Sequence, residues 1–346
     1  MRLKNKISIT LFLYLIIFSL ILVIPIFIYS QNQIRSSSIE INKNITDRYN
    51  QNISKQLEKV FSLAETIKIF IKNDILRQTV NRFSLVNTLN TILMENADLY
   101  GIWVCMEPNV LDNADAIYEG SEYHDHTGRF VPFLYREGDD IVIEPLVGYD
   151  DVENNDYWYI DPLNADGYTI TEPYFDDQSN VTMTSLIVNL KDEGIPVGVV
   201  GIDITMNKIQ KLIAEMLPEE VGFAELLDHN GLIIASQNHD SVGKHKDSAI
   251  IENMKDNISV EESSNYIIST SKINIPNVEN PWFISTYVNK NYIYKSLNKF
   301  KMITILYITM VIILSVILIY ISIIFTIKPI IKINKAFALI EDKKLA

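Results

Sequence analysis

The run Gly198-Val199-Val200-Gly201-Ile202-Asp203 is an apolar stretch of branched residues that ends in a carboxylate. Branched residues favour a strand, which we predict over 197–205. Because side chains alternate between the two faces of a strand, Val200 and Ile202 are expected to face one way and Asp203 the other. The carboxylate at the end of this strand is therefore the first candidate for a functional side chain.

Two motifs upstream add aromatic rings and further acids: Asn155-Asp156-Tyr157-Trp158-Tyr159 and Glu172-Pro173-Tyr174. The faces of aromatic rings attract cations, and carboxylates pair with cations directly. Together with Asp203, the two motifs are typical of a site for a small organic cation. Two alternative roles are left open for these residues. Asp156 could serve as the N-cap of a following helix, and the aromatic rings could belong to the hydrophobic core.

The central part of the sequence is typical of an antiparallel sheet. Apolar segments alternate with turn signals such as Glu137-Gly138-Asp139-Asp140 and Asp192-Glu193-Gly194. Further strands are expected near 100–106, 141–143 and 181–190. We therefore predict the α+β fold class, with a curved antiparallel sheet packed against helices and long loops. A β-sandwich is the alternative, and the helical pattern at the N-terminus disfavours it.

A long helix is predicted over 35–80, before the first strand. Apolar residues recur there at intervals of three and four positions, with polar residues between them. The stripe consists of Ile45, Tyr49, Ile53, Leu57, Val60, Phe61, Ala64, Ile67 and Ile71. Two partners for this stripe are left open: the globular part of the same chain, and a second copy in a homodimer.

Two segments without a charged residue, 7–34 and 302–327, each exceed the roughly 20 residues that cross a membrane as a helix. The first is too long for the apolar core of a signal peptide, so we interpret it as an uncleaved anchor. Basic residues within 1–6 favour a cytoplasmic N-terminus. A multi-pass membrane protein is predicted, with residues 35–301 outside the cytoplasm.

Acidic residues dominate the composition: the 346 residues include 30 Lys and Arg, 43 Asp and Glu, and carry a net charge of −13. Such a field concentrates cations and repels nucleic acid, so no nucleic-acid partner is expected. Acidity that only keeps an exported domain soluble is the alternative. Cys105 is the single cysteine, which excludes an intrachain disulfide, and we expect a small buried side chain there.

Six motifs, in order, resemble the double Cache sensor domain of bacterial methyl-accepting chemotaxis receptors, a domain that also occurs in sensor kinases and nucleotide cyclases. The motifs are 128–133, 144–147, Trp158-Tyr159, Glu172-Pro173-Tyr174, Met183-Thr184-Ser185-Leu186 and 198–203. Residues 222–231 and Pro281-Trp282-Phe283 resemble the second module of that domain. The resemblance covers about residues 35 to 300.

The resemblance implies two stacked PAS-like Cache modules on the long N-terminal helix, flanked by two transmembrane helices in the bacterial inner membrane. The membrane-distal module, 81–212, is expected to bind the ligand. The membrane-proximal module, 213–300, is expected to relay the signal, because we find no comparable cluster of charged and aromatic residues in its sequence. A homodimer is also predicted, from the apolar stripe of the long helix.

One branch of this family binds amino acids through an arginine two residues before Trp-Tyr, and through a later tyrosine and an aspartate. The residues that match this pattern are Trp158, Tyr159, Tyr174 and Asp203. The arginine position is Asp156, and the tyrosine expected five residues before it is Asp151. A carboxylate in place of the guanidinium repels an α-carboxylate, so the pattern is similar to amine-binding relatives. We predict methylamines, ethanolamine, choline or polyamines as ligands. Amino acids are the alternative, with Arg129 or Arg136 in place of the missing arginine.

No catalytic residue, cofactor or metal is predicted. The sequence contains no GxSxG, HExxH, P-loop or dinucleotide-binding fingerprint. His124-Asp125-His126 is more typical of a solvated loop than of a metal site. A hydrolase with paired carboxylates and an adhesion protein are the alternatives to a sensor.

Residues 328–346 begin with Lys328-Pro329 and continue as an amphipathic stripe, which resembles the first helix of a HAMP linker. We expect the output domain to lie beyond this sequence. A methyl-accepting domain that acts on the chemotaxis kinase complex is favoured. A histidine kinase or a cyclic-dinucleotide enzyme is the alternative.

Overall fold

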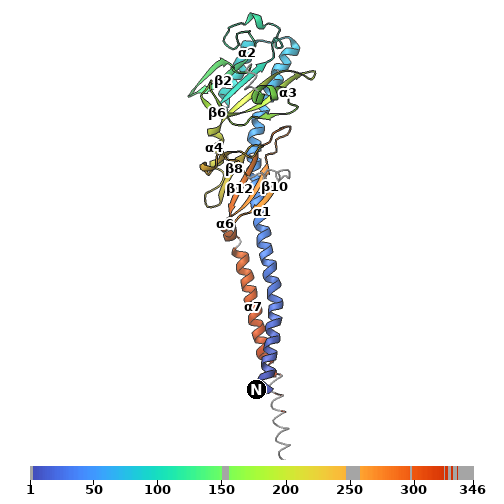
Figure 1. Cartoon of the computed structure of the whole chain (residues 1–346). Coiled ribbons are helices and arrows are strands. Elements are labelled where there is room, and N and C mark those ends of the chain that lie inside the picture. The colour runs from blue at the N-terminus through green and yellow to red at the C-terminus, as the bar shows by residue number, and fades with distance from the viewer. Residues whose placement is uncertain are drawn as a thin grey trace, which may run out of the picture. The chain divides into compact units, whose positions relative to one another are not determined.

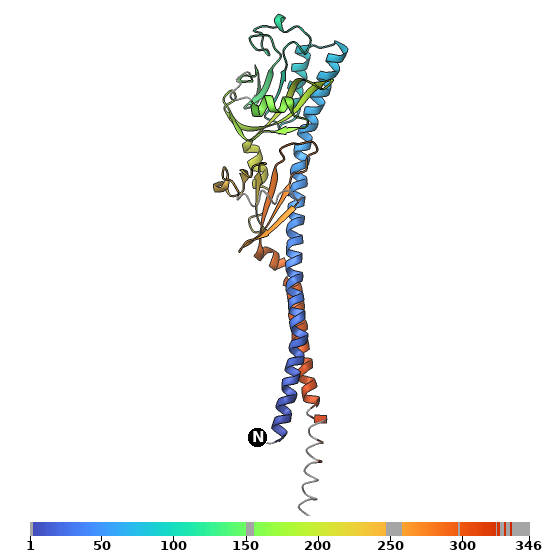
Figure 2. The ribbon, with the colours of Figure 1, turned by 45° about the vertical axis from the view of Figure 1, so that its right-hand side comes forward.

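The computed structural model describes residues 3–149, 156–246, 258–296 and 298–322, together with 324–325, 329 and 333. The chain has two compact units: one is Asn42–Asn289, and the other combines Met1–Ile41 with Lys290–Ala346 (Figures 1 and 2). Both sheets belong to the first unit. Helix α1 (Leu3–Arg77) is shared between the two units: its residues up to Ile41 belong to the second unit, and those from Asn42 onward belong to the first.

Within the first unit, α1 has the predicted apolar stripe. Its members from Tyr49 to Ile71 are buried, whereas Ile45 is half-buried. Aromatic stacking adds to the packing, since the ring centroid of Phe61 lies 4.7 Å from that of Tyr168. The stripe is therefore core of the chain itself over this length, which favours the intrachain alternative.

The first sheet is antiparallel throughout. Its strands are β1 (Gly101–Met106), β2 (Pro132–Glu137), β3 (Asp140–Pro145), β4 (Thr169–Ile170), β5 (Tyr174–Asp176), β6 (Val181–Asp192) and β7 (Ile195–Thr205). Within the described residues the order is β3-β2-β1-β7-β6-β4, and β5 pairs with β6 as well. The predicted α+β class is confirmed.

Both faces of the central strands β1 and β7 are covered. On one face, Val104 lines a small apolar cavity together with Ile71 of α1 and Leu89 of α2 (Arg82–Glu95). On the other, Trp103 and Val199 belong to a core cluster that includes residues from the loops and short helices. A carboxylate on this second face is consequently an interior group.

The short helices lie outside the sheets. They are η1 (Asp115–Ile117), η2 (Asp156–Ile160), α3 (Asp161–Asn164) and η3 (His239–Ser241). Helix α4 (Met206–Ala214) follows β7 directly, and its first turn is capped where the hydroxyl of Thr205 accepts a 3.2 Å hydrogen bond from the backbone N–H of Lys208. The chain passes through α4 from the first sheet to the second.

The second sheet is also antiparallel. Its strands are β8 (Gly222–Leu227), β9 (Ile233–Ser236), β10 (Ile258–Glu262), β11 (Tyr266–Lys272) and β12 (Phe283–Asn289). Within the described residues the order is β10-β11-β12-β8-β9. The strands of the first sheet lie within 101–205 and those of the second within 222–289. These parts of the chain are called the first and second modules below, and the predicted bounds 81–212 and 213–300 stay predictions.

A buried polar stripe of α1 packs on the second sheet. It consists of Asn42, Thr46, Asn50 and Ser54, spaced four residues apart. The side-chain amide of Asn42 donates to the carbonyl of Ile267 at 3.0 Å and to the hydroxyl of Ser269 at 2.9 Å. Thr46 pairs with Thr286 at 2.6 Å in the same way. Side chains on one helix face thereby satisfy polar groups that the sheet leaves unpaired.

The other unit consists of the first part of α1 together with α6 (Lys290–Ser296) and α7 (Asn298–Ser322). The hydroxyl of Ser30 donates to that of Thr304 at 3.2 Å. One helix among the described residues is long and apolar enough to cross a membrane, and it is Ile16–Arg77. The apolar part of α7, Met302–Leu318, is shorter. The predicted second span, 302–327, stays a prediction, and part of it lies outside the described residues.

We expect Asn42→Ala to lower the free energy of unfolding by roughly 1 to 3 kcal/mol, because it strands a buried carbonyl and a buried hydroxyl on the second sheet. Asn44→Ala is the matched control, since Asn44 is exposed two residues away on the same helix. Urea denaturation of the full chain in detergent measures both. Equal effects of the two substitutions would show that the polar stripe contributes nothing specific.

Candidate ligand-binding site

The site is built around Asp203, near the end of β7. In the sheet, Asp203 is the direct neighbour of Gly101 on β1 and of Ser185 on β6. Both neighbours are small, and a Cβ atom at position 101 would come within 2.8 Å of Oδ2 of Asp203. Glycine and serine thus leave room for a carboxylate in the middle of the sheet. The side chain of Asp203 is fully buried.

The two oxygens of the Asp203 carboxylate have different surroundings. Oδ1 accepts hydrogen bonds from the indole Nε1 of Trp103 at 2.9 Å and from the hydroxyl of Ser185 at 2.6 Å. Oδ2 is buried and has no hydrogen-bond partner among the described residues. A buried carboxylate oxygen without a donor is costly, so this atom is the one that a cationic or donor group would satisfy.

Burial also changes the protonation of Asp203. Desolvation raises the pKa of this carboxyl group to about 7, while the hydrogen bonds from Ser185 and Trp103 act in the opposite direction. The group therefore changes its charge near neutral pH. Such a shifted carboxyl in the interior is typical of a functional site.

Trp103 connects Asp203 to the aromatic motif. Its indole lies over Gly201 on the neighbouring strand, where a Cβ atom would approach the ring to 2.1 Å. The edge of the same indole meets Trp158 of η2 in a T-shaped contact with ring centroids 5.6 Å apart. Trp158 is half-buried. A glycine at position 201 is thus required for the indole to reach Asp203.

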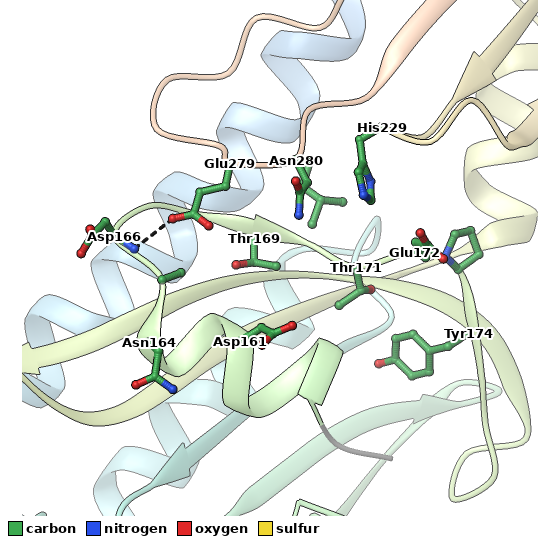
Figure 3. A pocket seen from close by; sticks show the side chains of 13 residues that line it. Asp161, Asn164, Asp166, Thr169, Thr171, Glu172, Tyr174, His229, Glu279 and Asn280 are labelled. Carbon is green, nitrogen blue, oxygen red and sulfur yellow. Dashed lines mark hydrogen bonds between the residues drawn. The ribbon is translucent and has the colours of Figure 1, made fainter. Parts of the chain in front are cut away.

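Tyr174 joins the group from β5, since its hydroxyl lies 2.7 Å from that of Ser185. It also lines an open cavity of about 780 Å³ (Figure 3). The opposite side of this cavity carries His229 and Asn280 from the second module. Trp158 is thus linked to Asp203 through Trp103, and Tyr174 is linked to it through Ser185. The role of all three in ligand binding stays a prediction.

Tyr159 belongs to a neighbouring cluster instead. Its hydroxyl is hydrogen-bonded to Glu107 and to the guanidinium of Arg129, and Arg129 in turn pairs with Glu107 at 3.0 Å. Arg129 Cζ lies 4.7 Å from the ring centroid of Tyr149. Tyr159 still contacts the group around Asp203 through its ring, whose centroid lies 6.0 Å from that of Trp158, and its role in ligand binding stays a prediction. Its ring faces the core, and its hydroxyl is already engaged.

Neither arginine considered as a substitute is available. Arg129 is engaged by Glu107 and Tyr159, as above. The guanidinium of Arg136 donates to the carbonyls of Leu99 at 3.0 Å and Asn96 at 3.3 Å, beside the end of α2. Both guanidinium groups therefore have structural partners.

Two predicted ligand residues lie outside the described part of the site. Asp151 is outside the described residues altogether. Asp156 begins η2, but its side chain is likewise not described. The contribution of both acids, and the N-cap alternative for Asp156, stay predictions.

Three members of the site were missed in the sequence: Gly101, Trp103 and Ser185. Gly101 and Trp103 lie in a predicted strand, but only the register of β1 against β7 places them beside Asp203. Cys105, by contrast, is fully buried as predicted. Burial raises the pKa of its thiol to about 12, so the thiol stays protonated.

The second module contains a charged and aromatic cluster that was not predicted. Lys246 and the buried Glu225 are 3.0 Å apart, and Lys246 Nζ lies 4.6 Å from the ring centroid of Tyr287. Phe223 stacks on Tyr287 with ring centroids 4.2 Å apart. These residues come from strands and a loop far apart in the sequence, so their proximity could not be seen there.

Comparison with known proteins supports a sensor domain. Residues 85–211 match the model of the methyl-accepting chemotaxis protein-like first PDC sensor domain. The chain is similar to methyl-accepting chemotaxis protein TlpQ of Pseudomonas aeruginosa, with 25% identity over 199 residues, or 54% of this chain and 26% of TlpQ. The chain thus spans about a quarter of the length of this relative.

Solved structures share the fold. The extracellular domain of the histidine-kinase candidate mmHK1S-Z2 has a TM-score of 0.63 at 22% identity, over 76% of this chain and 99% of that one. The ligand-binding domain of the Pseudomonas fluorescens chemoreceptor CtaA, solved with L-leucine, has a TM-score of 0.51 at 18% identity, over 76% and 99%. The fold and the family match together support a Cache, or PDC, sensor domain that resembles ligand-binding domains.

We expect Gly201→Ala to displace the indole of Trp103 and so remove a hydrogen bond from Asp203. Forcing a methyl group into this contact should lower the free energy of unfolding by roughly 1 to 3 kcal/mol. Urea denaturation measures the loss, and the emission of Trp103 should shift with it. Unchanged stability and emission would contradict the packing described.

Asp203 should also make stability depend on pH. Its pKa is higher in the folded chain than the ordinary value of 3.8, so the folded state holds the proton more tightly than the unfolded state. The resulting stabilisation is present at low pH and is lost as the pH rises from about 4 through about 7. Relative to the wild type, Asp203→Asn should therefore gain on the order of 2 kcal/mol between pH 5 and pH 8. Parallel stability profiles would contradict the raised pKa.

Proposed function

We propose that this chain is the extracytoplasmic sensor region of a transmembrane chemoreceptor and that its distal Cache module binds small organic amines. The sensor class rests on the family match over 85–211 and on the shared fold. The ligand class rests on the chemistry of the site. We propose Asp203, Trp158 and Tyr174 as ligand residues, together with Asp156 and Asp151, whose side chains lie outside the described part of the structure. The ring of Tyr159, whose centroid lies 6.0 Å from that of Trp158, would support Trp158 from the core side.

The unpartnered Oδ2 of Asp203 is the observation that carries this proposal. An ammonium group placed there gains a charge-assisted hydrogen bond, worth ~1.5 to 3 kcal/mol, and restores the pairing that burial removes. Indole and phenol faces add ~0.5 to 2 kcal/mol each to a cation. These contributions can together reach the roughly −8 kcal/mol of micromolar binding.

Amino acids are the competing ligands. CtaA, which shares the fold, was solved with L-leucine. An amino acid needs a cationic partner for its carboxylate as well as an acidic one for its ammonium. Arg129 and Arg136, the two arginines considered for that role, are both engaged in structural contacts. An amine has no carboxylate and needs only the acidic partner, so this site favours amines over amino acids.

Signalling would require that the ligand binds one of two conformations of the chain more tightly and so raises the population of that conformation. In our proposal, amine binding at Asp203 closes the pocket of the first sheet and shifts α1 or the path to the second span. The signal then passes through a homodimer, a second transmembrane span in α7 and a HAMP helix over 328–346 to the chemotaxis kinase complex. The similarity to mmHK1S-Z2 is the specific observation that favours a histidine kinase as the alternative output.

Amine binding is tested by calorimetry on the full chain in detergent, with ethanolamine, choline, methylamines and polyamines against the common amino acids. At least one amine should bind saturably, and Asp203→Asn and Asp156→Ala should weaken it at least tenfold. Because only the ionised form of Asp203 pairs with ammonium, the affinity should rise about tenfold from pH 6 to pH 8.

Asp192→Asn is the matched control, since it removes one negative charge at an exposed turn. This variant should bind as the wild type does. Binding of amino acids alone would overturn the ligand class. The absence of any saturable small ligand would favour an adhesion protein.

A further inference from the structure

A second cluster of potential ligand atoms lies where the two modules meet within unit Asn42–Asn289. Glu172 follows β4 of the first sheet, whereas Asp228 and His229 occupy the turn between β8 and β9 of the second. Each of the three offers one ligand atom, and these atoms lie within 4.8 Å of one another. Figure 3 shows Glu172 and His229 at the same end of the 780 Å³ cavity.

The carboxylate of Asp228 is held in place with one oxygen unused. Its Oδ1 accepts hydrogen bonds from the backbone N–H groups of Asn230 and Leu232, both at 2.8 Å. Asp228 is 1% exposed, and its Oδ2 is buried without a hydrogen-bond partner among the described residues. The turn therefore fixes a desolvated carboxylate oxygen beside His229 and Glu172, and no donor among the described side chains and backbone groups compensates it.

Glu172 completes the cluster from the other module. Its Oε1 accepts a 2.7 Å hydrogen bond from the side-chain amide of Asn230. This bond holds the carboxylate over the turn and leaves its second oxygen for another partner. Since Glu172 is exposed, its side chain can move toward an incoming ion. Neither Glu172 nor His229 is needed by the amine site around Asp203.

We propose that Glu172, Asp228 and His229 bind one divalent transition-metal ion, with zinc as the best fit. An imidazole nitrogen with two carboxylates suits zinc, whereas calcium and magnesium favour all-oxygen sites. Three atoms bound at about 2.1 Å to a tetrahedral ion lie roughly 3.4 Å apart, so a small inward movement of Glu172 and His229 closes the site. Water from the open cavity supplies the fourth ligand.

The ion would fasten one module to the other. Two backbone hydrogen bonds already join the modules: the N–H of Tyr168 donates to the carbonyl of Asn277 at 2.6 Å, and the N–H of Glu279 donates to the carbonyl of Tyr168 at 3.3 Å. The N–H of Asp166 also donates to the side-chain carboxylate of Glu279 at 3.0 Å. A metal that takes ligands from both sides strengthens this junction. Because it binds only the paired arrangement, zinc should raise the unfolding temperature of the chain.

Equilibrium dialysis of the full chain in detergent against zinc chloride tests the proposal. The wild type should bind one zinc ion at micromolar concentration, and His229→Ala and Glu172→Gln should each weaken it at least tenfold. His239→Ala is the matched control, since His239 is an exposed histidine of the same module, and it should bind as the wild type does.

Calorimetric unfolding supplies an independent reading. Zinc should raise the unfolding temperature of the wild type and of His239→Ala, but not that of His229→Ala. Three results would overturn the proposal: no zinc bound by the wild type, equal losses in His229→Ala and His239→Ala, or bound zinc that leaves the unfolding temperature unchanged. Retained amine binding by His229→Ala would show that the zinc site is separate from the amine site around Asp203.

Discussion

The half-paired carboxylate of Asp203 is the constraint on which the packing at the centre of the first sheet depends. Its position inside the sheet requires a glycine and a serine on the adjacent strands, and an indole that reaches it only because residue 201 is a glycine. One oxygen is satisfied by Trp103 and Ser185, and the other is not. Burial of such a group without compensation lowers stability, so its retention is best explained by a ligand that supplies the missing partner.

Buried polar side chains pair with buried backbone and hydroxyl groups elsewhere in this unit as well. Along α1, Asn42 and Thr46 satisfy groups of the second sheet in the interior, where an apolar stripe would leave them unpaired. In the β8–β9 turn, Oδ1 of Asp228 accepts hydrogen bonds from two backbone N–H groups, whereas its buried Oδ2 has no partner among the described residues. The unsatisfied oxygens of Asp203 and Asp228 lie in different modules. In our two proposals they bind different ligands: an organic ammonium beside aromatic rings, and a metal ion beside an imidazole.

Sequence patterns predicted the larger features well and the cross-strand neighbours poorly. Periodicity was sufficient for α1 and its apolar stripe, and turn signals were sufficient for the antiparallel sheet. Trp158, Tyr174 and Asp203 were predicted as ligand residues because they fit a family pattern, and these roles stay predictions. Ser185 and Trp103 were missed because their roles depend on register, which pairs residues far apart in the chain. Tyr159 matched the same pattern, yet the ion pair of Arg129 with Glu107 engages its hydroxyl. The polar stripe beginning at Asn42 was missed since periodicity identifies apolar residues only.

A crystal structure of the chain grown with the tightest-binding amine tests the central claim most directly. The account predicts electron density for the amine between Trp158, Tyr174 and β7, with its nitrogen within hydrogen-bond distance of Oδ2 of Asp203. A ligand bound in another place, or a free amino acid whose carboxylate is held by Arg129 or Arg136, would contradict it.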